Sequence, residues 1–444
     1  MFTKTKYYCK IKTLEHCYYY FMLDLKFILQ NRNLMEENCK KRNLRVDFDL
    51  IEKLADEKLS ILQLTEKLRA EINQISEQVK KQGKDKNKEL ILKGQTLKEK
   101  LKTEEKESRE INERLKEELY KTPNLIHADT PIGQSEKDNK EIEKIGKIPD
   151  FKFKPKNHLE IGRDLDIIDF ESGAKTTGSK FYFLKNEGLM LDMALSQYAL
   201  EILKKEGFEL LLTPDLAKIE LIEKLGYIPR GPETQIYKIE NNNLGLIGTA
   251  EITLGGVLSD KILSAKGLPI KLAGLSHCFR TEAGAYGKVS KGLYRVHQFN
   301  KTEMFIFCLP EESDKMLEYL VKIEKRIFKG LGIPLRIVNC CSGDLGAPAY
   351  QKFDIEAWMP GEEKWGEITS ASNCTDFQAR RLNIRFKNKN NKTEFIHTLN
   401  ATAIATSRTI IAILENFQEK DGSVLIPKPL QKWMGIKKIM ARKK

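Results

Sequence analysis

HCFRTEAGA at residues 277–285 and GLYRVHQFNKTE at residues 292–303 are the two stretches that decide the fold. Successive side chains of an extended strand point to opposite faces, so Arg280 and Glu282 are predicted to point to the same side of one strand. The sequence between the two stretches is polar and rich in glycine, which is typical of a tight loop, and alternation resumes from Leu293 to Phe299. The pattern therefore predicts two strands joined by a loop, with an arginine at the mouth. A guanidinium in that place can bind a phosphate or a carboxylate through two parallel hydrogen bonds.

Composition sets the broad class of the protein. The chain has 444 residues, of which 41% are hydrophobic and 31% charged, enough for a sizeable core and an extended polar element besides. A net charge of +13 indicates an anionic partner without saying which one. The eight cysteines form no C-x-x-C pair, so we interpret them as reduced thiols of an intracellular protein without a structural zinc site. No apolar run approaches 18 residues, so no membrane span is expected.

Two successive stretches near the N-terminus carry a heptad seam, because core positions recur at alternating steps of three and four. The seam positions are Ile51, Leu54, Lys58, Ile61, Thr65, Leu68, Ile72, Ile75 and Val79 in the first stretch, and Leu90, Gly94, Leu97, Leu101, Glu104, Ser108, Ile111 and Leu115 in the second. The sequence KKQGKDKNK at residues 80–88 separates the stretches, and Pro123 ends the second. The pattern predicts an antiparallel two-helix coiled-coil arm. Each run of roughly 30 residues spans about 45 Å at the helical rise.

The turn of this arm has its own charge. Between residues 22 and 120 there are 23 Lys and Arg against 21 Asp and Glu, a balance typical of solvated coiled-coil faces. The turn instead sets five lysines against one Asp85, and these are Lys80, Lys81, Lys84, Lys86 and Lys88. Five lysines at the tip of an arm suit a phosphate backbone, although a simple solvated turn has the same composition. No aromatic residue lies between Ile51, the first seam position, and Tyr120, which favours recognition of shape and backbone over base stacking.

The two stretches around Arg280 resemble the second signature motif of class II aminoacyl-tRNA synthetases, in the form found in seryl-tRNA synthetases. A helix expected from Met190 to Glu206, and the strand that leads from it to Pro214, resemble the first motif, which forms a dimer interface in that family. LNATAIATSR at residues 399–408 resembles the third motif, and an apolar helix is expected after it. The resemblance implies an α+β fold: a class II antiparallel sheet with flanking helices, preceded by the coiled-coil arm.

The same resemblance divides the chain into four parts. They are an N-terminal extension (1–21), a tRNA-binding domain with the arm (22–122), a linker (123–150) and a class II catalytic domain (151–444). Residues 1–14 carry four lysines and no acidic residue, so the extension is either an organellar transit peptide or translated sequence upstream of a true start at Met22. We expect a cytoplasmic protein, with the mitochondrial or plastid matrix as the alternative if the extension is a transit peptide.

LIGTAE at residues 246–251 resembles the serine-binding loop of the family. Thr249 and Glu251 are two apart, so a hydroxyl and a carboxylate can face one pocket and bind the hydroxyl and ammonium groups of free serine. The resemblance implies a serine site made of Thr249, Ala250, Glu251, Arg280, Glu303, Asn400 and Thr402.

Residues 353–374 are predicted to form two strands that bear alternating polar residues. The resemblance implies an ATP site made of Arg280, Thr281, Glu282, Phe299, Glu367, Ile368, Thr369, Ser370 and Arg408. In that reading Arg280 contacts the α-phosphate and the substrate carboxylate, and Arg408 contacts the γ-phosphate. Glu282 contacts the adenine amino group, and Phe299 stacks on the base. Glu367 and Ser370 offer hard oxygen ligands of the kind that Mg²⁺ prefers.

The implied activity is that of a serine–tRNA ligase, with ATP as a substrate and Mg²⁺ as cofactor. Its catalytic residues are expected to be Arg280, Glu367 and Arg408. Its partners would be free serine, the long variable arm and acceptor end of tRNA(Ser), and a second copy of the chain in a homodimer. Two alternatives stay open, a synthetase-like ligase that loads an amino acid onto a carrier protein and a non-catalytic tRNA-binding paralogue. The sequence also leaves open whether tRNA(Sec) is charged.

Overall fold

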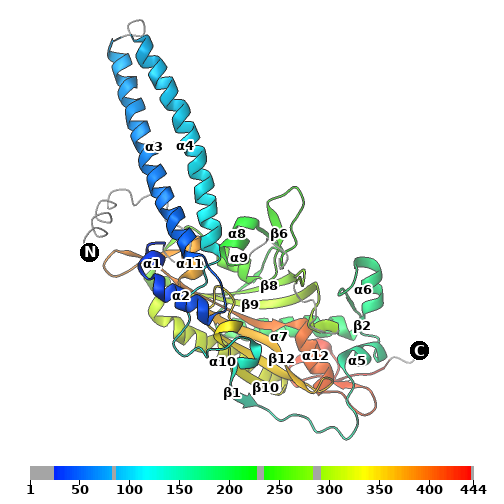
Figure 1. Ribbon diagram of the computed structural model, residues 1–444. Helices are drawn as coiled ribbons and strands as arrows, with labels where there is room; N and C mark the ends of the chain where they lie inside the picture. Colours follow the sequence, from blue (N-terminus) through cyan, green and yellow to red (C-terminus); the bar gives the residue numbers. More distant parts are fainter. Residues whose placement is uncertain (1–24, 83–86, 228–234, 284–291, 442–444) are drawn as a thin grey trace. The chain divides into compact units, whose positions relative to one another are not determined.

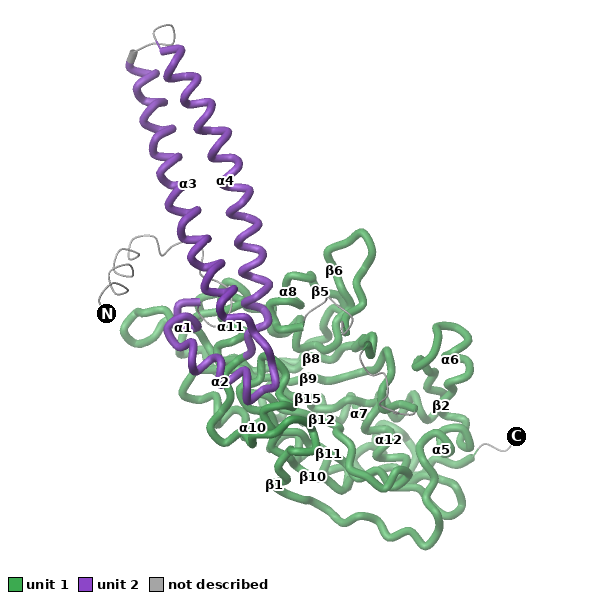
Figure 2. The backbone as a smooth tube through the Cα atoms, viewed as in Figure 1, with its two compact units in different colours: residues 1–21, 124–444 green, residues 22–123 purple. Residues whose placement is uncertain are grey.

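The computed structural model describes residues 25–82, 87–227, 235–283 and 292–441. This part of the chain divides into two units, one ending at Pro123 and the other beginning at Asn124 (Figure 2). Residues 1–21, with the expected extension, lie outside the described residues.

The first unit is helical and contains the predicted arm (Figure 1). Its helices are α1 (Leu25–Gln30), α2 (Arg32–Lys41), α3 (Phe48–Gln82) and α4 (Lys88–Tyr120). The heptad seam is the buried face of the long pair: Leu54 and Leu68 of α3 and Leu115 of α4 are all buried. A Cβ added at Gly94 would lie 3.5 Å from the Ile75 side chain, so the two helices approach closely there.

The helical hairpin is as predicted, but its break is shorter than the sequence indicated. Helix α3 continues through Lys80 and Lys81, and α4 begins at Lys88, because the lysines do not themselves end a helix. All three side chains are exposed. Lys84 and Lys86 lie outside the described residues.

The second unit is built on one eight-stranded sheet. In spatial order the strands are β1 (Lys140–Ile145), β10 (Leu335–Asn339), β11 (Gln351–Met359), β12 (Lys364–Asn373), β15 (His397–Ala405), β9 (Gln298–Cys308), β8 (Ile270–Phe279) and β4 (Glu209–Leu212). Every neighbouring pair is antiparallel except β4 with β8, which is parallel and forms one edge. The antiparallel sheet expected from the sequence is therefore confirmed.

The helices of the second unit are α5 (His158–Asp164), α6 (Phe170–Thr177), α7 (Glu187–Lys205), α8 (Ile219–Lys224), α9 (Glu251–Gly256), α10 (Ser313–Leu331), α11 (Phe377–Leu382), α12 (Thr406–Asn416) and α13 (Gln431–Met434). Helices α7, α9, α10, α11 and α12 pack against the eight-stranded sheet (Figure 1). Helix α10 shows how sequence sets these bounds, because it ends where Gly332 adopts the left-handed conformation (φ +75°) that glycine tolerates best. Within the described residues, no helix combines the length and apolar character needed to cross a membrane.

Four small sheets complete the second unit. They pair β2 (Ile168–Asp169) with β3 (Phe183–Leu184), β5 (Leu216–Lys218) with β6 (Leu244–Leu246), β16 (Val424–Leu425) with β17 (Lys438–Ile439), and β13 (Arg385–Lys387) with both β14 (Thr393–Phe395) and β7 (Ile262–Ser264).

Alternation along β9 explains how the sheet carries both a core and a pocket. Met304 and Ile306 point into the larger core, where α7, α10 and α12 pack. Phe305 belongs to the smaller core with α8 and α9, and Lys301 and Glu303 line the pocket. Successive residues of a strand face opposite sides, so one strand contributes to core and site at once.

The structure corrects the prediction around Arg280. Strand β8 ends at Phe279, and Glu282 adopts a positive φ of 51°, so the two residues do not lie on one strand as expected. The second strand also begins later than the predicted Leu293, because residues 292–294 form the 3₁₀ turn η5 (Gly292–Tyr294). The predicted pairing itself holds, since Phe279 of β8 lies opposite Gln298 of β9.

Candidate active site

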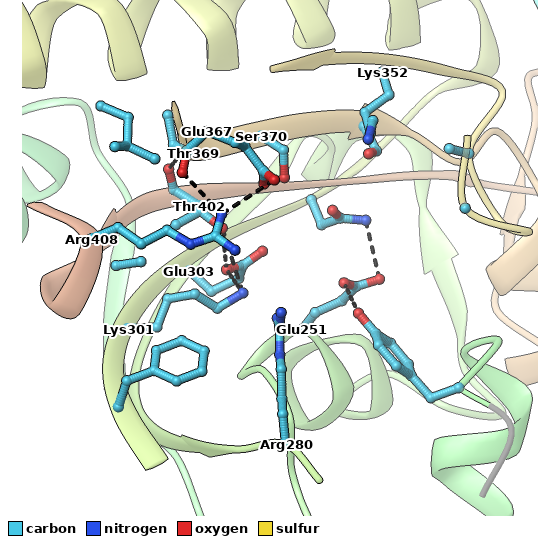
Figure 3. Close-up of a pocket in the computed structure, with 18 of the residues that line it drawn as sticks. Glu251, Arg280, Lys301, Glu303, Lys352, Glu367, Thr369, Ser370, Thr402 and Arg408 are labelled. Atoms are coloured by element: carbon cyan, nitrogen blue, oxygen red, sulfur yellow. Dashed lines mark hydrogen bonds and ion pairs between the residues drawn. The ribbon is translucent and has the colours of Figure 1, made fainter. Parts of the chain in front are cut away.

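A cavity of about 440 Å³ lies on the sheet face opposite the larger core (Figure 3). Strands β9, β12 and β15, helix α12 and the segment after β8 supply most of its wall. Twelve residues predicted from the sequence line it: Glu251, Arg280, Glu282, Phe299, Glu303, Glu367, Ile368, Thr369, Ser370, Asn400, Thr402 and Arg408. The residues expected to bind ATP and those expected to bind serine thus meet in one cavity.

Arg280 follows the last residue of β8 and points into the cavity (Figure 3). Its Nε donates to the backbone carbonyl of Gly248 at 3.2 Å, which fixes the direction of the guanidinium. The guanidinium also lies 5.3 Å from the centre of the Phe299 ring, a cation–π distance. In this structure Phe299 therefore supports Arg280. Its expected stacking on adenine stays a prediction.

Arg408 and Glu367 meet on the opposite side of the cavity. Arg408 lies in the first turn of α12 and stacks over the Tyr294 ring at 4.7 Å. Its guanidinium is 3.2 Å from the Glu367 carboxylate and donates to the Glu367 backbone carbonyl at 3.0 Å. Burial acts to raise the pKa of Glu367, but Arg408 and Lys352 outweigh it and hold that pKa below its usual value. Glu367 is thus an ionised carboxylate beside a cation.

Glu282 pairs with a residue that the sequence did not single out. The Arg295 guanidinium lies 3.3 Å from the Glu282 carboxylate, and Arg295 itself lines the cavity directly after η5. Glu282 follows the end of β8, has a positive φ of 51°, and lines the cavity as well.

The carboxylate of Glu251 is held at the N-terminus of α9 by three donors. Tyr227 donates at 2.7 Å, Gln378 at 2.7 Å and Asn400 at 3.1 Å. Glu251 is only 5% exposed. Burial, with a smaller contribution from the negative charge of Glu303, raises the pKa of Glu251 to about 6.

Glu303 is the second buried carboxylate at this end of the cavity. It pairs with Lys301, two residues earlier on the same face of β9, at 2.6 Å. The Thr402 hydroxyl on the neighbouring strand β15 donates to Glu303 at 3.1 Å. Carboxylates and a hydroxyl in one buried pocket are suited to a ligand that carries an ammonium and a hydroxyl group.

A further cation faces the cavity from β11. Lys352 lies 3.2 Å from Asp354 and 3.4 Å from Asp344. Burial raises the pKa of Asp354 to about 7, against the opposing effect of Lys352. Asp354 is directly opposite Ser370 in the β11–β12 register, so this charged group borders the β12 residues of the ATP set.

Three predicted residues do not line the cavity. Thr249 is buried behind it, where its hydroxyl accepts from the Glu251 backbone N–H at 3.3 Å. Ala250 packs in the smaller core, and the Thr281 backbone N–H donates to Gln235. In this structure they support neighbouring residues, and direct ligand contacts by them stay predictions.

Glu367 and Ser370 fit a hard divalent cation. Glu367 is kept ionised, and both residues line the cavity on β12. The Ser370 hydroxyl makes no protein hydrogen bond among those of the described residues, so its oxygen is available to a ligand. One carboxylate and one hydroxyl, completed by phosphate oxygens, suit Mg²⁺.

Comparison with known proteins places this site in a family. The model of the "tRNA synthetase class II core domain (G, H, P, S and T)" matches residues 236–417, and that of the "Seryl-tRNA synthetase N-terminal domain" matches residues 22–126. A serine–tRNA ligase of Dictyoglomus thermophilum is 52% identical over 425 residues, which are 95% of this chain and 100% of the relative. The chain belongs to the seryl-tRNA synthetase family.

Two solved structures of the seryl-tRNA synthetase family agree in fold. The enzyme of Pyrococcus horikoshii, complexed with ATP, is 40% identical and superposes with a TM-score of 0.83 over 95% of this chain and 100% of its own. The cytoplasmic enzyme of Naegleria fowleri, in complex with AMP, is 29% identical with a TM-score of 0.78 over 96% and 100%. Both solved relatives hold an adenine nucleotide, which is the ligand that the sequence resemblance implied.

Several residues that line the cavity of this seryl-tRNA synthetase family member were not predicted as site residues from the sequence. They are Tyr227, Tyr294, Arg295, Lys301 and Lys352. The sequence does carry a signal for Lys301, because it lies two residues before Glu303 and so points to the same face of the strand. For Gln378, which binds Glu251 from 127 residues away, no signal existed, because only the packing of α11 brings the two together.

Proposed function

We infer that this chain is a serine–tRNA ligase, which activates serine with ATP and transfers the seryl group to tRNA. The observation that carries the inference is that one cavity joins Arg280 and Arg408 to the buried carboxylates Glu251 and Glu303. Guanidinium groups in the cavity suit a triphosphate, and its buried carboxylates suit an ammonium group. The match to two relatives named serine–tRNA ligase extends over the full length of those relatives.

In the first step a carboxylate oxygen of serine attacks the α-phosphorus of ATP, the bond to the bridging oxygen breaks, and pyrophosphate leaves with that electron pair. No protein nucleophile is needed. Arg280 would hold the α-phosphate and the serine carboxylate together, so that two anions approach each other at a cation. Arg408 would hold the γ-phosphate, and Glu282 would accept from the adenine amino group.

In the second step a hydroxyl of the 3′-terminal ribose of tRNA attacks the carbonyl of seryl-adenylate, and AMP leaves. The chain's part is again positioning. Glu251 and Glu303 would keep the serine ammonium in place, and Asn400 and Thr402 would frame the side chain.

We propose Glu367 and Ser370 as the residues that hold Mg²⁺. The metal would supply neutralisation of the phosphate charge. The ionised state of Glu367 and the available hydroxyl of Ser370 support this assignment.

We propose that the α3–α4 arm binds the long variable arm of tRNA(Ser) through its lysine-rich tip, while the acceptor end enters the cavity. The exposure of Lys80, Lys81 and Lys88 supports the proposal.

We propose a homodimer that uses the open edge of the sheet. Strand β4 is paired on one side only, and its Leu212 is 81% exposed. Leu189, Met190 and Met193 on the adjacent α7 are exposed as well. An apolar patch beside an unpaired strand edge is a typical site for a second copy of the chain.

The four-part domain division stays part of the proposal, as does a cytoplasmic location. The bacterial sources of the curated relatives support the cytoplasm. An organellar matrix is the alternative if residues 1–21 act as a transit peptide.

The test is ATP–pyrophosphate exchange by the purified protein with a panel of amino acids. Serine should drive exchange, and alanine should be weak, because a site built to bind a hydroxyl can reject the analogue without it by roughly 10⁴. Threonine differs by one methyl group, which alone discriminates by only about 1 to 3 kcal/mol. Exchange driven better by alanine, proline or threonine would exclude the assignment. Exchange with serine but no transfer to tRNA would favour the carrier-protein ligase, and no exchange at all would favour the non-catalytic paralogue.

A further inference from the structure

Four segments far apart in the sequence meet at the buried side chain of His158. His158 begins α5, Glu415 lies near the end of α12, Gly361 lies in the turn after β11, and Leu293 lies in η5. His158 is 3% exposed and Glu415 is 1% exposed. This cluster lies outside the cavity, and the proposed chemistry makes no use of it.

The hydrogen bonds of this cluster fix the tautomer of His158. The backbone N–H of Leu293 donates to Nε2 at 3.3 Å, so Nε2 must carry a lone pair. The proton of the neutral ring is therefore on Nδ1, which lies 2.9 Å from Oε1 of Glu415 and donates to it. Glu415 also accepts the backbone N–H groups of His158 at 3.0 Å and of Gly361 at 2.9 Å, so its two oxygens are both engaged.

Glycine at two of these positions allows the segments to approach this closely. A Cβ at Gly292 would lie 2.1 Å from Nε2 of His158, and Gly292 has a φ of +65° that favours glycine. A Cβ at Gly361 would lie 2.6 Å from the Cα of Asn157. Backbone and imidazole are therefore in direct contact, and a small movement of the ring would displace η5.

The turn that His158 holds carries two residues of the nucleotide site. Tyr294 directly follows Leu293, and its ring supports the Arg408 guanidinium at 4.7 Å. A Cβ at Gly366 would lie 3.1 Å from that ring, so Tyr294 also packs against the residue before Glu367. Arg295 follows next and pairs with Glu282 at 3.3 Å. The contacts expected at the γ-phosphate and at the adenine thus both depend on η5.

We propose that His158, oriented by Glu415, is a positioning residue for ATP: its Nε2 accepts from the Leu293 N–H and thereby fixes Tyr294 and Arg295 beneath the nucleotide. The inference rests on the proposed ATP site and names a residue that acts on it from outside. Glu415 serves as the orienting partner of the imidazole, in the way that a carboxylate fixes the tautomer of a histidine ligand or base.

Two conservative substitutions separate the two nitrogens of the ring. His158→Gln can place an amide oxygen near the position of Nε2 and so keep an acceptor for Leu293. His158→Asn is shorter, can keep a donor near the position of Nδ1 for Glu415, and loses the acceptor. If His158 positions η5, the Gln variant keeps its affinity for ATP and the Asn variant loses it. If His158 only stabilises the fold, both variants lose thermal stability and neither loses ATP affinity selectively.

The experiment measures ATP affinity by calorimetry on the full-length protein without amino acid, then KM for ATP and for serine in pyrophosphate exchange. For His158→Asn we expect ATP affinity to fall by about three- to tenfold, the equivalent of one net hydrogen bond, with KM for serine within about twofold of wild type. Gly292→Ala disturbs the same contact from the turn and should give the same selective loss of ATP affinity. His397→Gln is the matched control, because His397 also bonds within the protein, at 2.9 Å from the Ser313 hydroxyl, without touching η5.

Wild-type ATP affinity in both His158→Asn and Gly292→Ala would overturn the proposal, as would an equal rise of both KM values. A loss of ATP affinity in His397→Gln as large as in His158→Asn would also overturn it. Failure of the proposed function has a different signature, because the wild-type protein itself would then show no serine-dependent exchange. Calorimetry with ATP alone would still test the role of His158 in that event.

Discussion

The Arg408 guanidinium in the first turn of α12 and the Glu367 carboxylate on β12 lie 3.2 Å apart, and each stabilises the charged form of the other. Burial alone would raise the pKa of Glu367, and the cations around it hold that pKa low. Tyr294 supports the other face of the guanidinium. The pair therefore presents an anion and a cation side by side, which matches a ligand made of phosphates and a divalent cation.

Replacing Glu367 by Gln should reduce ATP–pyrophosphate exchange by a factor on the order of 10² to 10³, because the amide cannot neutralise the metal that the phosphates need. Glu356→Gln is the matched control. It makes the same change at the residue paired with Glu367 in the β11–β12 register, where the carboxylate binds Arg336 outside the cavity. Exchange by Glu367→Gln within about threefold of the control would remove Glu367 from the metal site.

Glu251 should make serine binding depend on pH. Its pKa is raised to about 6, so the carboxyl is neutral below that pH and cannot pair with the serine ammonium. We expect KM for serine, measured at saturating ATP, to rise by about fivefold between pH 6 and pH 5, because the ionised fraction of Glu251 falls by that factor. Glu251→Gln should have a high KM that does not change over this range. A flat profile in the wild-type protein would exclude Glu251 as the ammonium ligand.

The same raised pKa affects folding. A carboxyl whose folded pKa lies above its unfolded value of 4.5 stabilises the fold most when protonated, below pH 4.5, and this contribution is lost as pH rises through about 6. The difference between a pKa of 4.5 in the unfolded chain and about 6 in the folded one corresponds to about 2 kcal/mol. We therefore compare the free energy of unfolding of Glu251→Gln with that of the wild type, both measured by denaturant in the ligand-free state. The variant should gain stability relative to the wild type when the pH is raised from 4.5 to 7, because only the wild type loses the contribution of a protonated carboxyl.

Periodic patterns in the sequence predicted much of the fold. Heptad steps predicted the arm because a long helix pair buries one stripe of side chains, and the seam residues Leu54 and Leu115 are indeed buried. Alternation predicted β11 and β12 because each strand has one polar face toward the cavity. It failed at Arg280, because β8 already ends at Phe279 and Glu282 adopts a positive φ of 51°.

The site was predictable only where its residues belong to a motif. Arg280, Glu367 and Arg408 come from three such motifs, and all three line one cavity. Contacts made by packing left no signal in the sequence. The Glu251–Gln378 bond joins α9 to α11, and the His158–Leu293 bond joins α5 to η5, so both depend on the folded arrangement of distant segments.

Arg280→Ala should reduce exchange by on the order of 10² to 10³, because a charge-assisted contact with the reacting phosphate is worth roughly 3 to 4 kcal/mol in the transition state. The fold should survive, since within the described part of the chain the Arg280 side chain contributes one hydrogen bond, from Nε to the Gly248 carbonyl, and one ring contact, with Phe299. Arg336→Ala is a control that removes an arginine from the same sheet without touching the cavity. Near-normal exchange by a folded Arg280→Ala protein would remove Arg280 from the mechanism.

Met193→Asp combined with Leu212→Asp should convert a homodimer into a monomer. Both side chains belong to the exposed apolar patch on α7 and β4, and a carboxylate there would have to be buried without a partner in the interface. Sedimentation at micromolar concentration measures the state. Leu92→Asp, at an exposed leucine on the arm helix α4, should leave the dimer intact. A wild-type protein that sediments only as a monomer would contradict the dimer itself.

The arm should serve tRNA and leave adenylation alone. Deleting residues 55–115 and closing the gap with a short linker should leave serine-dependent exchange mostly intact, because the cavity is lined entirely by residues from Gly226 onward. Charging of tRNA should be abolished.

The milder change replaces Lys80, Lys81, Lys84, Lys86 and Lys88 by Gln. Each phosphate contact that is lost should flatten the slope of log K against log salt concentration by about 1. Lys98, Lys100 and Lys102 are exposed lysines along α4, and their replacement by Gln is the control for a change of total charge. Equal effects of the two lysine sets would mean that charge acts along the whole arm, and no effect of the tip set would make the turn a solvated loop and leave recognition to the helices.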